Sequence, residues 1–404
     1  MKVLYIHTIG AFGGASRSLY EALIAMPEGA IEPHFVAPRG TSYRYFKEFG
    51  PVLTGWGLSQ FDHTRYSRYR GARWIVLLRE ITFVLPTLLV LLRAKMRWKR
   101  FDVIHVNEVT GVLPWLVARS LFKAPVLVHV RSVTTDDVRL RRTRWLHGLL
   151  RSKAAAVVAI DETVRASLPA DVRVDVVHNA FSPYDSFPAD KVLREALARL
   201  RPESFKVGFV GNLLRVKGIA ELIDAARLLR DRGVDVELIV VGGDTRPSRG
   251  AKAWLLRMLG IGQDMGEEVR AAIARFGLTD RVHMTGFSAD ITTAYKAMDA
   301  LCFPSHLDAP GAPIFEAAHL KVPSIVAIDD PRPDTLVDGR TGLAVPARDS
   351  GALADAIETL AKDCALAARM GAAAYQLAVE QFDAQQNSLM LLDIYKGMLC
   401  TARH

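Results

Sequence analysis

Short apolar runs alternate with longer amphipathic stretches along the first half of the chain. The apolar runs are rich in Val and Ile and predict strands at residues 2–9, 32–38, 102–107, 125–131 and 155–160. Apolar positions at helical spacing lie between these runs and predict helices at residues 16–26, 74–97 and 111–121. Such alternation is typical of a parallel, doubly wound α/β sheet.

The same alternation begins again after a polar, Pro-containing stretch at residues 181–190. It predicts strands at residues 205–211, 236–243, 281–287, 300–305, 322–328 and 342–346, and helices at residues 218–231, 264–276, 313–320 and 351–362. We therefore expect two Rossmann-like domains (1–182 and 204–382), a linker (183–203) and a final helix within 383–404 that could pack on either domain. Two such domains predict a central cleft, because open α/β sheets bind ligands at the carboxyl ends of their strands.

The composition agrees with a globular protein of two domains, since half of the 404 residues are hydrophobic and a quarter are charged. Cys302, Cys364 and Cys400 are scattered and odd in number, which favours a reducing compartment over a disulfide framework or a zinc site. The start, MKVLYIHTIG, has no small-residue cleavage site and is interpreted as a strand rather than a signal peptide. A cytoplasmic protein is expected.

The net charge of +9 predicts anionic partners. Residues 74–92 have the length of a membrane span, but Arg79 and Glu80 in the middle would each cost about 2.5–3.5 kcal/mol to insert, so a buried or interfacial helix is expected. Basic runs occur at residues 65–70, 93–100 and 139–144 without any nucleic-acid-binding module. An anionic membrane surface therefore fits better than nucleic acid, and a solvated basic face is the alternative.

Three loops could bind an anionic ligand. Gly13 and Gly14 precede a helix and could expose backbone N–H groups to a phosphate, although G-x-x-G-G is not the dinucleotide fingerprint and a plain tight turn is the alternative. Arg215 and Lys217 follow the strand at 205–211 and would suit a diphosphate, unless they are ordinary surface charges.

The third loop, PSHLDAPGAPIFEAA at residues 304–318, contains Asp308 and Glu316. Pro313 suits a first helical position, which would put Glu316 in the first turn, where the helix dipole favours an acid. Such an acid could be structural or could bind a ligand. The loop follows a strand of the same predicted sheet as the Arg215 and Lys217 loop, which favours a ligand site.

Several enzyme classes lack their motifs in this chain. There is no D-x-D pair to hold a metal on a nucleotide sugar, no H-E-x-x-H or C-x-x-C zinc motif and no G-x-S-x-G nucleophile elbow. No metal site and no cofactor are expected. A nicotinamide oxidoreductase is disfavoured because neither domain has the dinucleotide fingerprint.

The chain resembles glycosyltransferase family 4, the retaining transferases with the two-Rossmann-domain GT-B fold. The motifs that carry the resemblance follow the family's order: GAFGGASRSL, FDVIHVN, VVHNAF, VGNLLRVKGIAELIDA, RVHMTGFSADITTAYKAMDALCFPS, the E-x7-E signature with Asp308 in place of the first Glu, and DTLVDGRTGLAVPARD.

The resemblance implies roles for individual residues on the donor side. Glu316 is expected to bind the ribose of a nucleotide-sugar donor, Asp308 the donor sugar, and the backbone near Gly311 and Ala312 the diphosphate. Lys217 matches the family's diphosphate lysine. The family often has Arg where this chain has Asn212, and Arg215 is expected to supply that cation.

The resemblance also points to the end of the strand PVLVHVRS. The family's catalytic His corresponds by spacing to Arg131, while His129 lies two residues earlier on the same face. Either could touch the reacting sugar, and a buried structural role is the alternative for His129. Asn107, Glu108 and Arg131 are expected to contact the acceptor.

The resulting hypothesis is a retaining, metal-independent transferase that moves a sugar from a UDP- or GDP-sugar to a glycan or lipid-linked acceptor in envelope, lipopolysaccharide or exopolysaccharide synthesis. It would act on the cytoplasmic face of a membrane, without nucleic acid. A nucleotide-binding scaffold without turnover and a nucleotide-sugar epimerase remain the alternatives.

Overall fold

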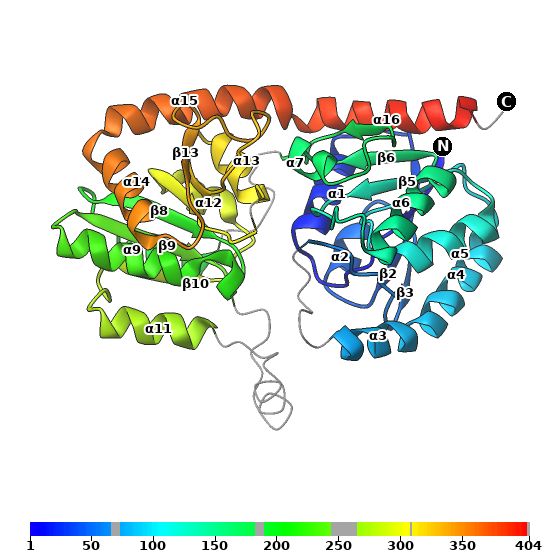
Figure 1. The fold of residues 1–404 in the computed structure, drawn as a ribbon, viewed down its shortest axis with the longest axis horizontal. Helices are drawn as coiled ribbons and strands as arrows, with labels where there is room; N and C mark the ends of the chain where they lie inside the picture. Colours follow the sequence, from blue (N-terminus) through cyan, green and yellow to red (C-terminus); the bar gives the residue numbers. More distant parts are fainter. Residues whose placement is uncertain (66–72, 182–189, 244–264, 308, 402–404) are drawn as a thin grey trace. The chain divides into compact units, whose positions relative to one another are not determined.

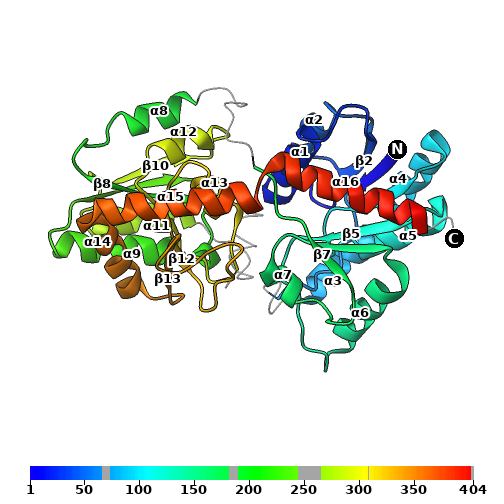
Figure 2. The same ribbon diagram turned by 90° about the horizontal axis from the view of Figure 1, so that it is seen from above.

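The computed structural model describes residues 1–65, 73–181, 190–243, 265–307 and 309–401 (Figures 1 and 2). The chain divides into two compact units, residues 1–182 with 382–404 (unit 1) and residues 183–381 (unit 2). Each unit contains one parallel sheet with helices packed on it. The predicted pair of parallel α/β domains is confirmed.

Unit 1 is built on a seven-stranded sheet in the order β3-β2-β1-β4-β5-β6-β7. Its strands are β1 (Lys2–Ile6), β2 (Glu32–Pro38), β3 (Val52–Gly55), β4 (Val103–Val106), β5 (Val126–Val130), β6 (Ala156–Ala159) and β7 (Val174–Val176). Its helices are α1 (Gly14–Ile24), α2 (Ser42–Phe46), α3 (Arg73–Thr82), α4 (Val84–Trp98), α5 (Val112–Phe122), α6 (Arg141–Lys153), α7 (Glu162–Ala166) and α16 (Ala384–Thr401). The central strands are buried on both faces, which explains their mostly apolar sequences; His105 in β4 and His129 in β5 are the buried polar exceptions.

Helix α16 packs in unit 1, one of the two placements that the sequence left open. It lies along α1 (Figures 1 and 2), and Leu391, Leu392, Tyr395 and Met398 join the core that Val3, Tyr5 and Val103 contribute from the sheet. Ser388 donates a hydrogen bond of 2.8 Å to the carbonyl of Ala22 in α1. The C-terminal helix therefore completes the core of the N-terminal domain.

The prediction of one long helix at residues 74–97 is wrong, because two helices, α3 and α4, meet at Phe83. Pro86 explains the break. It has no N–H to donate to the carbonyl of Thr82, and its ring would clash with that carbonyl in a continuous helix. None of the helices among the described residues is long and apolar enough to cross a bilayer.

Unit 2 is built on a six-stranded sheet in the order β10-β9-β8-β11-β12-β13. Its strands are β8 (Phe205–Val210), β9 (Val236–Val241), β10 (Val282–Gly286), β11 (Ala300–Phe303), β12 (Ser324–Ala327) and β13 (Gly342–Val345). Its helices are α8 (Lys191–Leu197), the 3₁₀ turn η1 (Arg215–Lys217), α9 (Ile219–Asp231), α11 (Met265–Arg275), α12 (Ile291–Lys296), α13 (Ala312–Ala318), α14 (Ser350–Lys362) and α15 (Cys364–Gln381). Helix α8, capped by the Asp190 side chain, lies in the stretch expected to be a linker.

Two helical glycines allow a test of how closely α15 packs. A Cβ on Gly371 of α15 would lie 2.0 Å from the carbonyl oxygen of Lys321, whereas the same position on Gly397 of α16 has no described heavy atom within 4 Å. We expect Gly371→Ala to lower the free energy of unfolding by about 1–3 kcal/mol through overpacking. Gly397→Ala should raise it by about 0.5–1 kcal/mol through helix propensity. Urea unfolding of both variants checks this, and a shift in the same direction for both would contradict the packing at α15.

Candidate functional site

The sheet of unit 2 has one place where its strand order reverses. The chain adds β9 and β10 on one side of β8 and β11 to β13 on the other, so β8 and β11 are neighbours at the reversal. In open α/β sheets, ligands bind beyond the carboxyl ends of the strands at such a reversal. The two loops predicted to bind the donor, at residues 211–218 and 304–311, follow these two strands.

The two loops of unit 2 are in direct contact. Gly218 has φ +73°, and a Cβ there would lie 1.8 Å from the carbonyl oxygen of Pro304, so only glycine fits. The N–H of His306 donates to the carbonyl of Val216 at 2.9 Å. The imidazole of His306 lies 2.9 Å from a carboxylate oxygen of Glu221 in α9. These contacts fix the first loop against the second.

The two predicted cations differ in their surroundings. The ammonium of Lys217 lies 5.3 Å from the centre of the Phe303 ring, at the carboxyl end of β11. Arg215 forms an ion pair of 2.6 Å with Glu268 of α11, and both side chains are about half exposed. Lys217 is therefore held at the strand reversal, while the charge of Arg215 is partly balanced by Glu268.

Helix α13 begins one residue earlier than expected. Gly311 is its N-cap, and a Cβ there would lie 2.5 Å from the Phe303 ring. Ala312 is the first helical residue and Pro313 the second, so the expectation that Glu316 belongs to the first turn is wrong. Glu316 starts the second turn, is 5% exposed and accepts a hydrogen bond of 2.7 Å from the buried Tyr295 hydroxyl. Asp308 lies outside the described residues.

The sheet of unit 1 reverses between β1 and β4. The loop after β1 leads to Gly13, the N-cap of α1, and Gly14, its first residue; both are exposed, and no described heavy atom lies within 4 Å of a Cβ at either position. The Ser16 hydroxyl accepts a hydrogen bond of 2.7 Å from the N–H of Gly13 and donates one of 3.0 Å to the carbonyl of Gly13. The glycine backbone is thus fixed locally and accessible.

A buried polar layer crosses three strands at the carboxyl edge of this sheet. Asn107, which follows β4 and is fully buried, contacts His7 after β1 at 3.0 Å and the carbonyl of Ala15 at 3.1 Å. Its side-chain oxygen accepts a hydrogen bond of 2.8 Å from Arg131, which follows β5. Asn107 therefore holds Arg131 in place, and every contact seen for its side chain lies inside unit 1.

Arg131 is the centre of this layer. Its guanidinium also donates to the side-chain oxygen of Asn179 at 2.6 Å and lies 3.4 Å from a ring nitrogen of His129. Burial lowers the pKa of Arg131 to about 10, which still leaves it charged at neutral pH. The buried Glu108 carboxylate accepts bonds from the Ser132 hydroxyl and the Val109 N–H, both at 2.8 Å, although burial raises its pKa.

Three buried histidines surround Arg131 and are neutral at pH 7. Burial, and then the nearby Arg131 cation, lowers the pKa of His7 to about 3 and those of His105 and His129 well below the usual value. The Tyr395 hydroxyl of α16 lies 2.5 Å from a ring nitrogen of His105. Within the described residues, no three His, Cys, Asp or Glu side chains gather as metal ligands would.

The sequence pattern did not identify several residues of these two regions. Tyr295 lies in the quoted motif RVHMTGFSADITTAYKAMDALCFPS but was given no role, and Tyr395 lies in the final helix, where apolar spacing alone marks it as a core position. His7 lies within the strand predicted at residues 2–9, and Asn179 lies in the quoted VVHNAF motif, so only Asn179 was marked by a motif.

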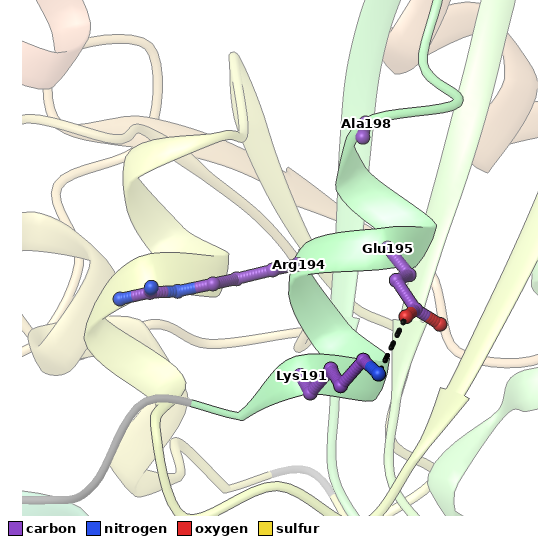
Figure 3. A pocket seen from close by; sticks show the side chains of 4 residues that line it. All are labelled: Lys191, Arg194, Glu195 and Ala198. Carbon is purple, nitrogen blue, oxygen red and sulfur yellow. Dashed lines mark ion pairs between the residues drawn. The ribbon is translucent and has the colours of Figure 1, made fainter.

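A pocket in unit 2 does not coincide with either region. It is lined by Lys191, Arg194 and Glu195 of α8 and by Ala198, the C-cap of that helix (Figure 3). Lys191 and Glu195 form an ion pair of 3.7 Å, and Arg194 points away from this pair in Figure 3. None of the predicted site residues lines it.

Comparisons with known proteins agree with the two-domain division. A family model described as "Glycosyl transferase 4-like domain" matches residues 13–181, and "Glycosyl transferases group 1" matches residues 196–377.

Curated relatives are similar along large parts of the chain. The lipopolysaccharide core biosynthesis mannosyltransferase LpsB of Rhizobium meliloti (strain 1021) is 26% identical over 310 residues, which cover 75% of this chain and 82% of LpsB. The capsular polysaccharide biosynthesis glycosyltransferase CapM of Staphylococcus aureus is 26% identical over 228 residues. That match covers 54% of this chain and 55% of CapM, about half of each protein.

A solved structure shows the same fold. The Anabaena protein HepE, in a complex with UDP and glucose, superposes with a TM-score of 0.73 at 20% identity, over 97% of this chain and 98% of HepE. The chain is an enzyme with the GT-B fold and belongs to the glycosyltransferases of the family 4 type.

Proposed function

We propose that this transferase moves a sugar, with retention and without a metal ion, from a UDP- or GDP-sugar to a glycan or lipid-linked acceptor in envelope, lipopolysaccharide or exopolysaccharide synthesis. The observation that carries the proposal is the meeting of two loops at the strand reversal of unit 2. One loop brings Lys217 and the other leads to the buried carboxylate of Glu316. A cation and an acid at one sheet edge suit a ligand with both a phosphate and hydroxyl groups.

Several groups of unit 2 would hold the donor at this edge of the sheet. Glu316 accepts hydrogen bonds from the ribose hydroxyls, and its bond from Tyr295 holds the carboxylate in place at the start of α13. Lys217 binds the diphosphate, with Arg215 as a second cation. The backbone near Gly311 and Ala312 binds the diphosphate, and Asp308 holds the sugar. The backbone of Gly13 and Gly14 is proposed as a further contact for the donor.

Unit 1 would bind the acceptor and the reacting sugar. Arg131 is proposed to supply the positive charge of the polar layer to the reaction, because the described histidines around it are neutral. Asn107 and Glu108 position its side chain and backbone for the acceptor. His129 touches the sugar or the acceptor as a neutral imidazole, with one ring nitrogen lacking a described protein partner.

The chemistry needs charge stabilisation more than a nucleophile. When the sugar leaves the diphosphate, negative charge grows on the phosphate oxygens, and fixed cations such as Lys217 stabilise it in the transition state. Retention would follow from attack on the face that the diphosphate leaves, with a donor phosphate oxygen accepting the acceptor's proton. No covalent intermediate on the protein is then required.

The names of the relatives support the substrate class. CapM is named for capsular polysaccharide biosynthesis and LpsB for the lipopolysaccharide core, and HepE was crystallised with UDP and glucose. These support a nucleoside-diphosphate sugar and a cell-surface glycan. A lipid-linked acceptor would place the enzyme peripherally on the cytoplasmic face of a membrane.

The first test is the loss of donor binding in Glu316→Gln, which keeps the size of the side chain and removes its charge. Charge-assisted hydrogen bonds are about twice as strong as neutral ones, so we expect at least about a tenfold weaker affinity. Calorimetric titration of UDP, GDP, ADP and NAD into both proteins, without metal, measures this. Glu203→Ala, an exposed acid before β8, serves as the control. Equal affinity of Glu316→Gln and wild type would overturn the site.

A second test concerns stereochemistry and metal. With the nucleotide sugar that binds, transfer should continue in excess EDTA, and the anomeric proton coupling of the new linkage should match that of the donor. Conversion of the donor to an isomer in the absence of acceptor would instead indicate an epimerase. If the protein binds the nucleotide sugar but shows neither transfer nor slow hydrolysis of the donor, it would be a scaffold.

The buried histidines predict a pH dependence of stability. His129 stays neutral in the folded state while an unfolded histidine protonates near pH 6.5, so the unfolded state binds more protons below that pH and stability falls as pH falls. Between about pH 7 and pH 5.5 this residue alone should cost about 1.3 kcal/mol. In urea unfolding, the free energy of unfolding of His129→Leu should fall less than that of the wild type between these two pH values, by about the same 1.3 kcal/mol. Val128→Ala, a neighbouring core change, should keep the full fall; equal falls in all three proteins would contradict the neutral burial.

A further inference from the structure

An exposed apolar stripe runs along two consecutive helices of unit 1. On α4, Leu85, Leu89, Leu92 and Met96 recur at positions i, i+4, i+7 and i+11, which is one face of a helix. Their exposed fractions are 62%, 58%, 45% and 74%. The opposite face is packed in the core through Thr87, Val90, Leu91, Ala94 and Trp98.

The stripe continues on the preceding helix. Figure 1 shows α3 and α4 following one another end to end, and Leu77, Leu78 and Ile81 of α3 are each more than half exposed. Beside the junction, a Cβ on Gly57 would lie 2.6 Å from the Phe83 ring, so the loop after β3 abuts Phe83. The adjacent Trp56 is 79% exposed. Tryptophan is enriched where membranes meet water.

The exposed charges between residues 77 and 100 are of one sign. Between residues 77 and 100 the chain has six cations, Arg79, Arg93, Lys95, Arg97, Lys99 and Arg100, and one acid. That acid, Glu80, is buried and bonded to Arg79 and to the N–H of Gln60. Every exposed charge on α4 and the two residues after it is therefore positive. The basic run at 93–100 belongs to this surface; most of the run at 65–70 lies outside the described residues.

We propose that the face formed by Leu77, Leu78, Ile81, Leu85, Leu89, Leu92 and Met96 docks on a bilayer that contains anionic lipid. An apolar stripe of leucines bordered by Lys and Arg is the pattern of a helix that lies in the membrane interface. A second copy of this chain is a poorer occupant, because a symmetric contact would bring the cations of both copies together. All residues of this surface belong to unit 1. The docking proposal rests on the proposed function only where it is linked to a lipid-linked acceptor.

Vesicle flotation tests the docking surface with the full chain. Wild type should bind vesicles of equimolar phosphatidylcholine and phosphatidylglycerol, bind pure phosphatidylcholine weakly, and be released as salt is raised. Leu85→Ser with Leu89→Ser should weaken binding to the anionic vesicles by at least about tenfold. Leu389→Ser with Met390→Ser, which removes two exposed apolar side chains from α16, is the matched control and should bind as wild type.

A charge pair completes the test. Arg93→Gln with Arg97→Gln should weaken binding by about fivefold for each cation, whereas Lys47→Gln with Lys153→Gln, the same change of charge elsewhere on unit 1, should not. The docking surface is overturned if wild type does not bind anionic vesicles, if the leucine pair and its control bind equally, or if the leucine pair only dissociates a dimer. Nucleotide titration separates the two proposals, because all four variants should keep donor binding even where vesicle binding is lost.

Discussion

A parallel sheet that grows on one side and then on the other has a single reversal, and the two units of this protein depend on it. At β1/β4 and at β8/β11, the connections leave toward opposite faces, so the edge between the two strands is not covered by a crossover helix. Close contacts then fix the loops there: Gly218 against Pro304 in one unit, and Asn107 against His7 in the other. The strand order thus decides which loops, and therefore which side chains, meet at each edge.

Unit 1 holds the partly buried cation of Arg131 beside buried, neutral histidines. Burying Arg131 is tolerable because side-chain oxygens of Asn107 and Asn179 accept its hydrogen bonds, so little of the guanidinium is left unsatisfied. The histidines beside it accommodate the charge by remaining neutral. Such an arrangement fixes one geometry, since loss of any acceptor leaves a buried charge uncompensated.

The parts of the fold that the sequence predicted are those with a strong apolar pattern. Strands β4 and β11 are buried at every position; β11 is an unbroken apolar run, and β4 is apolar except for the buried His105. The edge strands β3 and β7 are only partly buried and were missed, as was α15, whose many alanines favour a helix without producing an apolar stripe. Among the proposed site residues, Glu316, Lys217 and Arg131 were predicted from local motifs. Tyr295 and Tyr395 were not, because their partners lie 21 and 290 residues away and only tertiary packing joins them.

The return of α16 to unit 1 affects how the chain is made. Residues 183–381 form a separate unit, so about 200 residues are synthesised between the end of the N-terminal part and the helix that completes it. At about 5–20 residues per second this takes roughly 10–40 s, during which the sheet around Val3, Tyr5 and Val103 lacks Leu391, Leu392 and Tyr395. The nascent N-terminal domain therefore presents an unfinished apolar face on the ribosome until α16 has been synthesised.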